Sequence, residues 1–229
     1  MKILFITNNV PPHSEAAVTR VSKCSARLAA WGHDVTLLTT HCPDEGGSSS
    51  GLVAEMLDGV RVIRIKTKSG GRLLRALASL WFILMASLGT SMSRPEIVVA
   101  TSPPLFTAVA GWLLGCRFRR SFVFELGDAG PGSILATRGT RGNLGRRLMA
   151  CLELALYGRA DAVITVTQAF KARLIEHGIP ASKIAVVNDR DDLSGDMCQR
   201  QAEEMLQVLE IVKATWGSQV GEPDDVERK

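Results

Sequence analysis

Residues 1–40 read MKILFITNNVPPHSEAAVTRVSKCSARLAAWGHDVTLLTT, and this stretch decides the fold class. It opens with a short apolar run over 2–7, typical of a buried strand, which ends at the Asn-Asn-Val-Pro-Pro that follows. From Ser14 onward, apolar residues recur at spacings of three and four, which predicts a helix that stops at Gly32. A second apolar run covers 35–40. The stretch therefore predicts a strand, a helix and a second strand parallel to the first.

The same alternation of strand and helix continues to about residue 190. Further β-branched runs lie at 59–65, 97–101, 122–126, 162–166 and 184–187, with helical patterns at 104–115, 142–158 and 168–177. We therefore predict a doubly wound, mostly parallel α/β sheet of about seven strands over residues 1–190, with a surface loop before the 59–65 strand. Residues 191–229 are expected to form a helix, with Met205, Leu209 and Val212 on its apolar face, and a polar tail.

Composition narrows the class of protein. The chain has 229 residues, 46% of them hydrophobic and 22% charged, which suits one domain with a sizeable core. The net charge of +4 is too small to indicate nucleic acid, and a single Tyr gives no base-stacking platform, so we expect no nucleic-acid partner. Five scattered cysteines without a C-x-x-C pair predict free thiols and no metal site. The first apolar run is too short for a signal peptide, which favours a cytoplasmic protein.

Residues 76–93, ALASLWFILMASLGTSMS, carry no charge. The length is borderline for a membrane span, but a single crossing would separate strands that should share one sheet. A buried crossover helix and a helix lying on a membrane surface both remain open. Arg72, Arg75 and Arg94 flank the segment, and arginines at 117–120 and 138–147 add positive charge. These groups are either solvated surface charge or a site that attracts anionic lipid, at the inner face of the cell membrane, or a lipid diphosphate.

Ligands of an open α/β sheet bind beyond the carboxyl ends of its strands, so the loops after the strands contain the candidate site. The loop over 8–15 leads into a helix whose amino-terminal end suits phosphate. Neither a G-x-G-x-x-G nor a P-loop follows the first strand, which weakens assignments as a nicotinamide dehydrogenase or a nucleotide triphosphatase. Ser102 is placed to cap the helix that Pro103 and Pro104 begin, and a contact to a substrate hydroxyl is compatible with that position.

The loop after the 122–126 strand reads Glu125-Leu-Gly-Asp128-Ala-Gly-Pro-Gly-Ser and is the richest in candidate groups. Two carboxylates lie among glycines of this loop, and the glycines allow a ligand to approach the backbone closely. Because side chains of a strand alternate in direction, Glu125 and Asp128 need not point the same way. For Asp128, a role in a site and a role in capping the turn both remain open.

Seven segments together resemble the amino-terminal domain of family-4 glycosyltransferases. They are, in order, MKILFITNNVPP, LAAWGHDVTLLTT, GVRVIRI, PEIVVATSPPLF, FVFELGDAGPGSI, ALYGRADAVITVT and GIPASKIAVVND. The similarity is greatest to bacterial cell-surface polysaccharide enzymes of the colanic-acid and amino-sugar transferase type, and it covers about residues 1–190. The ordered set is specific, whereas the G-H-x-V-T run alone is common in such proteins.

This resemblance implies a GT-B architecture, in which two Rossmann-like domains face each other across a cleft. It implies retaining, metal-independent transfer of a sugar from a nucleotide donor, with no resident cofactor. The first domain mainly holds the acceptor, often lipid-linked, and the second holds the nucleotide sugar. On this basis the candidate catalytic residues are Asp128 and Glu125. The candidate substrate-binding residues are Ala16, Ala17, Arg20 and Ser102.

Three departures from the family pattern weaken independent catalysis. Ser14-Glu-Ala-Ala17 stands where a glycine pair usually approaches the donor diphosphate. The segment after Glu125 lacks the Arg, Trp and second Glu of the family's E-x-R-D-L-W-P-E-S. Asn188-Asp-Arg-Asp191 replaces the linker N-G-V-D, and no E-x7-E donor motif follows. We therefore expect an acceptor-side domain that needs a separate donor-domain partner. A non-catalytic remnant, or a module that binds lipid-linked sugar, is the alternative, and an unrelated nucleotide-binding enzyme is a third.

Overall fold

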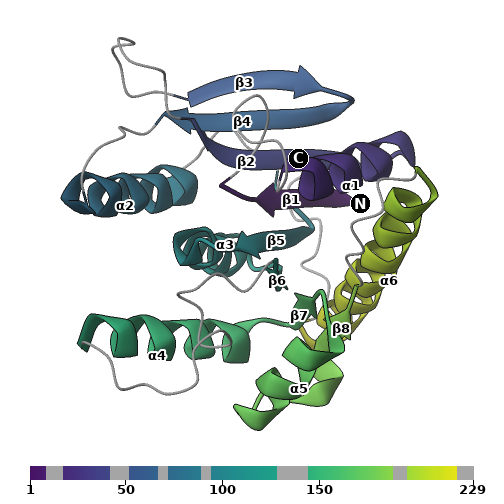
Figure 1. Cartoon of the computed structure of the whole chain (residues 1–229). Coiled ribbons are helices and arrows are strands. Elements are labelled where there is room, and N and C mark those ends of the chain that lie inside the picture. The colour runs from purple at the N-terminus through teal and green to yellow at the C-terminus, as the bar shows by residue number, and fades with distance from the viewer. Residues whose placement is uncertain are drawn as a thin grey trace.

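A computed structural model describes residues 1–8, 18–41, 52–66, 72–88, 94–127, 144–187 and 195–220. Within these residues the strands form one sheet of eight, in the order β3-β4-β2-β1-β5-β6-β7-β8 (Figure 1). The strands are β1 (Lys2–Ile6), β2 (Asp34–His41), β3 (Leu52–Leu57), β4 (Val60–Lys66), β5 (Ile97–Ser102), β6 (Ser121–Leu126), β7 (Ala162–Thr165) and β8 (Ile184–Val186). The helices are α1 (Val18–Ala30), α2 (Arg72–Leu88), α3 (Leu105–Phe118), α4 (Leu144–Arg159), α5 (Gln168–Glu176) and α6 (Gly195–Val220).

The predicted fold class is confirmed: the sheet is parallel except at one edge. β1 lies at its centre and pairs in parallel with both β2 and β5. The exception is β3, which pairs antiparallel with β4 through a turn at Asp58 and Gly59, both at positive φ. The sequence pattern predicts a loop over the residues of β3, and this prediction is wrong. Residues 53–57 are exposed on this edge strand, so they show none of the apolar alternation by which strands are recognised.

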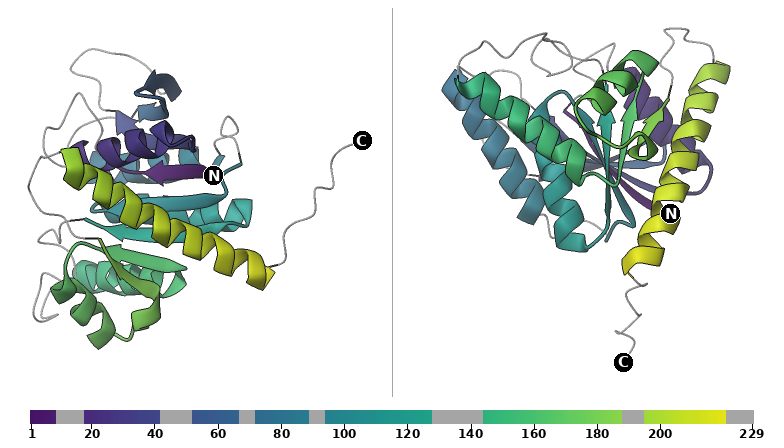
Figure 2. Two further views of the ribbon diagram at one scale, coloured as in Figure 1. Left: turned by 90° about the vertical axis from the view of Figure 1, so that its right-hand side faces the viewer. Right: turned by 90° about the horizontal axis from the view of Figure 1, so that it is seen from below.

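Helices cover both faces of the sheet and bury two apolar cores (Figure 2). α2, α3 and α4 lie on one face, where Leu4 and Ile6 of β1 point, and α1 and α6 lie on the other, where Ile3 and Phe5 point. This division follows from right-handed crossovers, because the chain winds outward from β1 in one direction and then crosses to β5 and continues in the other. The central strands are therefore apolar on both faces.

Helix α6 packs along α1 on the second face. Its residues Ala202, Met205, Leu209 and Val212 are buried in the core, which confirms the apolar face predicted for this helix. Met205 contacts Cys24 of α1, with the two sulfur atoms 3.5 Å apart. At its far end, Lys213 Nζ donates to Glu96 Oε1 at 2.6 Å, just before β5 begins. Helix α6 therefore packs against the domain formed by the preceding residues.

The end of α1 confirms Gly32 as a helix stop. Gly32 has a φ of 87°, its N–H donates to the Ala29 carbonyl at 2.9 Å, and the His33 N–H donates to the Leu28 carbonyl at 3.1 Å. This pair of bonds is the Schellman motif, which favours glycine at the left-handed position. His33 Nδ1 lies 3.0 Å from the amino-terminal nitrogen, so this histidine ties the amino terminus to the α1–β2 turn, as a structural residue would.

This contact predicts a loss of stability in mild acid. Burial lowers the pKa of His33 below its usual 6.5, and the nearby amino-terminal charge lowers it further. The unfolded chain therefore binds a proton more readily than the folded one, and the free energy of unfolding falls as the pH drops through 6.5. Chemical denaturation between about pH 7.5 and 5.5 measures this slope. His33→Gln should reduce the dependence of the free energy of unfolding on pH. His177→Gln, which changes an exposed histidine, should leave this dependence as it is in the wild type. An equal pH dependence in all three proteins would contradict the assignment to His33.

Candidate functional site

The carboxyl ends of β1, β2, β5 and β6 lie side by side at one edge of the sheet, where an open α/β fold binds its ligands. At β1, the Thr40 hydroxyl donates to Asn8 Oδ1 at 2.6 Å. This bond ties the residue after β1 to the neighbouring strand β2. It places Asn8, the residue two positions after the end of β1, at this edge.

Glu125 of β6 is a buried carboxylate, with 1% of its surface exposed. Its Oε2 accepts a hydrogen bond from the Thr101 hydroxyl at 3.1 Å. The two residues are partners in the parallel register of β5 and β6, and partners in such a register point to the same face. That face is the one covered by α1 and α6, because Val99 and Val123, two positions earlier, lie in that core. A buried carboxylate needs such donors, and Glu125 in turn fixes the half-buried Thr101 hydroxyl at the site edge.

Ser102 lies at the end of β5 and points to the opposite face, in register with Leu126. The prediction that it caps the next helix is wrong. The capping position of α3 is Pro104, without a side-chain hydrogen bond, which places Ser102 two residues too early to cap it. The Thr107 hydroxyl instead bonds the carbonyls of Thr101 and Pro104, at 2.6 and 2.5 Å.

Gly127 brings β6 against β5 at the point where both strands end. Its N–H donates to the Ser102 carbonyl at 2.8 Å, and a Cβ at this position would lie 3.2 Å from that oxygen. The close approach expected of the glycines is therefore, at Gly127, an approach of two neighbouring strands. It holds the first residue of the loop after β6 beside the end of β5.

The structure places the predicted site residues unevenly. Glu125 and Ser102 lie at the same edge of the sheet but on opposite faces. Arg20 lies in the first turn of α1, beside the carboxyl end of β1, and only its backbone is described. Ala16, Ala17 and Asp128 lie outside the described residues.

Thr101 and the Asn8–Thr40 pair were not singled out from the sequence. Their role depends on which strands are neighbours and in what register, and no local pattern carries that information. The alternation of side chains along a strand predicts that Thr101 and Ser102 point to opposite faces. It does not predict that Thr101 lies beside Glu125 of the neighbouring strand. In the part of the chain that the structure describes, no group of His, Cys, Asp and Glu side chains could hold a metal ion.

Three solved structures share this fold at low sequence identity. Sucrose-phosphate synthase from Thermosynechococcus elongatus is 15% identical, with a TM-score of 0.61 over 81% of this chain and 47% of that one. UDP-GlcNAc 2-epimerase from Methanocaldococcus jannaschii is 16% identical, with a TM-score of 0.50 over 95% and 53%. The lipopolysaccharide outer core galactosyltransferase WaaB is 14% identical, with a TM-score of 0.50 over 85% and 47%. The likeness shows the fold, and this chain spans about half the length of each.

The sequence itself identifies the family. No curated protein matches the chain. The family model of the glycosyl transferase 4-like domain, however, matches residues 16–189, which is well over half of the chain and includes every strand except β1. The structure agrees, because the doubly wound sheet has the architecture of one half of the GT-B glycosyltransferases among its structural neighbours. The chain belongs to the family of glycosyl transferase 4-like domains.

Proposed function

We propose that this chain is the acceptor-side domain of a retaining, sugar-nucleotide-dependent glycosyltransferase of cell-surface polysaccharide synthesis, inactive without a donor-binding domain. The observation that carries the proposal is the family match over residues 16–189 on a GT-B half-fold. A lipid-linked saccharide is the acceptor we propose, and a nucleotide sugar is the co-substrate.

In this proposal the amino-terminal end of α1 faces the donor diphosphate. The free N–H groups of the first turn of α1 and the positive end of its dipole attract phosphate, and Arg20 in that turn adds a full charge. Ala16 and Ala17 directly precede this helix in the sequence. These groups would neutralise the leaving diphosphate as its bond to the anomeric carbon breaks.

On the acceptor side, Asp128 orients or deprotonates the attacking hydroxyl, one position after Gly127. Glu125 contributes indirectly, because it fixes Thr101, whose hydroxyl lies 3.1 Å from the Glu125 carboxylate. Ser102 lies on the other face of β5 and is buried, with 5% of its surface exposed. Holding two reactants in attack geometry supplies much of the rate of such reactions. The donor-side contacts would come from the second domain, so this chain completes a site but does not make one alone.

A transfer assay tests the proposal directly. A panel of nucleotide sugars is offered with an undecaprenyl-linked saccharide, to the chain alone and to the chain with a co-encoded Rossmann-like partner. We expect no turnover by the chain alone and turnover with the partner, lost in Asp128→Asn. Robust turnover by the chain alone would overturn the proposal. Acceptor binding without transfer in any combination would favour the non-catalytic module that binds lipid-linked sugar.

A second prediction concerns Glu125. In the reconstituted enzyme, Glu125→Gln should lower transfer roughly tenfold or more, because an amide has a single acceptor oxygen and holds the Thr101 hydroxyl less firmly than a carboxyl group. Glu153→Gln is the matched control: Glu153 is also buried and also accepts from a hydroxyl, that of Tyr157 at 2.6 Å, but it lies in the middle of α4. Turnover and melting temperature are measured for both variants. Equal turnover in the two, at equal melting temperature, would remove Glu125 from the site.

A further inference from the structure

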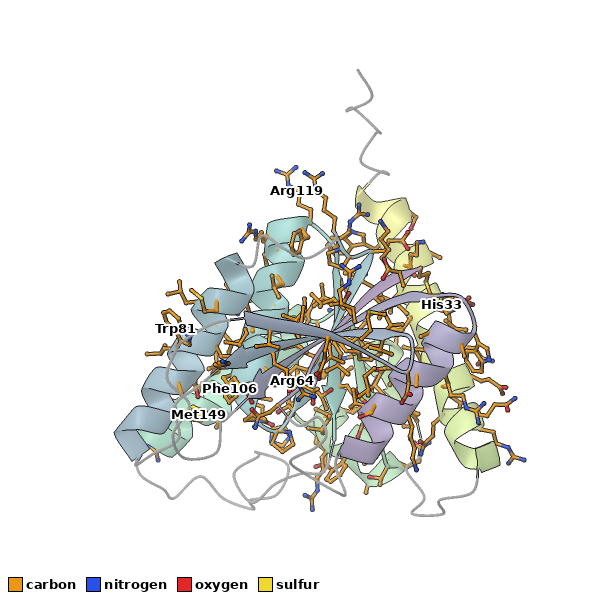
Figure 3. All side chains as sticks on the ribbon, turned by 90° about the horizontal axis from the view of Figure 1, so that it is seen from above. His33, Arg64, Trp81, Phe106, Arg119 and Met149 are labelled. Carbon is orange, nitrogen blue, oxygen red and sulfur yellow. The ribbon has the colours of Figure 1, made fainter. Side chains whose placement is uncertain are left out.

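Two helices on the first face of the sheet expose large apolar side chains. On α2 these are Leu80, Trp81 and Leu84, and on α4 they are Leu148, Met149 and Leu152. We call these six residues the α2/α4 face. In Figure 3, Trp81 and Met149 lie on the same side of the molecule, opposite His33. Exposed apolar residues scattered singly are ordinary, but a group of this size marks an interaction surface.

The two helices are joined by α3, which lies between them (Figure 1). Phe106 of α3 packs edge-on against Phe82 of α2, with ring centroids 5.3 Å apart. Trp112 of α3 lies beneath the Arg159 guanidinium of α4, at 5.2 Å. Phe106 and Trp112 are themselves only partly buried, so α3 also exposes some aromatic surface.

The same three helices are strongly basic. Their sequences contain six arginines and a single acidic residue, Glu153, which is buried and bonded to Tyr157. Helices α1 and α6, on the opposite face, together carry five basic and four acidic residues. The whole chain has a net charge of only +4, so positive charge is concentrated on the side that also exposes the apolar groups. Arg147 is exposed directly beside Leu148 and Met149.

We propose that the α2/α4 face docks onto a bilayer rich in anionic lipid. Its apolar side chains enter the interfacial region and its arginines approach the phosphates, which is how amphipathic surfaces bind such membranes. The charge argues against a second copy as the occupant, because a two-fold contact would place two arginine-rich surfaces against each other. The inference rests on this surface and not on the proposed transfer reaction.

None of the described helices is long and apolar enough to cross a membrane. For α2, which contains residues 76–88 of the uncharged segment noted in the sequence, this leaves the two arrangements that the sequence held open. Phe82 and Ala86 are buried against the sheet, while Leu80, Trp81 and Leu84 face outward. The helix is a crossover element on one side and a candidate lipid contact on the other.

Flotation of the full chain with vesicles of phosphatidylcholine, with and without phosphatidylglycerol, tests the proposal. We expect binding only when the anionic lipid is present, weakened by salt. The double variant Leu80→Gln with Leu148→Gln should lower binding roughly tenfold or more, because two exposed apolar contacts are lost. The matched control is Met56→Gln with Ile211→Gln. These side chains are 67% and 66% exposed, close to the 63% and 70% of Leu80 and Leu148, but they lie on other surfaces.

Arg147→Gln provides a second variant that leaves the apolar contacts intact. It should weaken binding to the anionic vesicles roughly fivefold and make the binding less sensitive to salt. Binding that ignores lipid charge and salt, or that is equal in the Leu80/Leu148 double variant and the wild type, would overturn the proposal. So would self-association in sedimentation that this double variant abolishes while vesicle binding is absent.

Discussion

Leu209→Ala should lower the free energy of unfolding by about 2–5 kcal/mol, the range for removing a buried leucine side chain from a packed core. Leu209 is fully buried in α6, in the core shared with α1 and the sheet. Met205 and Val212, in the same helix, are buried on either side of Leu209, so α6 is expected to stabilise the domain.

The matched control is Ile211→Ala, two residues along the same helix. Ile211 is exposed, so its truncation should change the free energy of unfolding by no more than about 0.5 kcal/mol. Urea denaturation followed by circular dichroism measures both variants. Equal and small effects would mean that α6 does not dock on this domain in solution. A removal of residues 194–229 should then also leave the melting temperature unchanged, whereas docking predicts a clear decrease.

Gly111→Ala should destabilise the protein by about 1–3 kcal/mol, although alanine is the better helix former. Gly111 lies in α3 where the helix crosses β5. A Cβ there would lie 2.6 Å from the Cβ of Ala100 and 3.0 Å from the Phe122 ring. The first contact is with an atom fixed to the backbone, so a shift of the helix from the sheet is needed to relieve it.

Gly217→Ala is the control, because Gly217 is also helical but its added Cβ would meet nothing within 4 Å. It should raise the free energy of unfolding by roughly 0.5–1 kcal/mol through helix propensity. Combining Gly111→Ala with Ala100→Gly removes the obstructing methyl and should recover part of the loss, a coupling that a double-mutant cycle detects. Additive effects of the two changes would show that this contact is not the cause.

Local pattern alone determined most of the fold. The apolar runs separated by helical spacing over residues 1–40 predicted a strand, a helix and a parallel strand, and β1, α1 and β2 confirm it. Gly32 was recognisable as the stop of α1, and the apolar face of α6 was recognisable from Met205, Leu209 and Val212. These features succeed because burial repeats with the period of each element, and that period is written in neighbouring residues.

Tertiary structure decided what local pattern does not contain. The sequence does not reveal β3, because an edge strand buries too few side chains to show alternation. β3 is held by its pairing with β4 and by an ion pair in which Arg64 Nη2 lies 2.7 Å from Glu55 Oε1. Ser102 failed as a cap because α3 begins three residues after it. Glu125 meets Thr101, and α6 meets α1, only because strand order and register bring residues far apart in sequence together. Strand order and register are determined by the packing of the whole sheet, because the pairing partners of a strand lie outside any local window of the sequence.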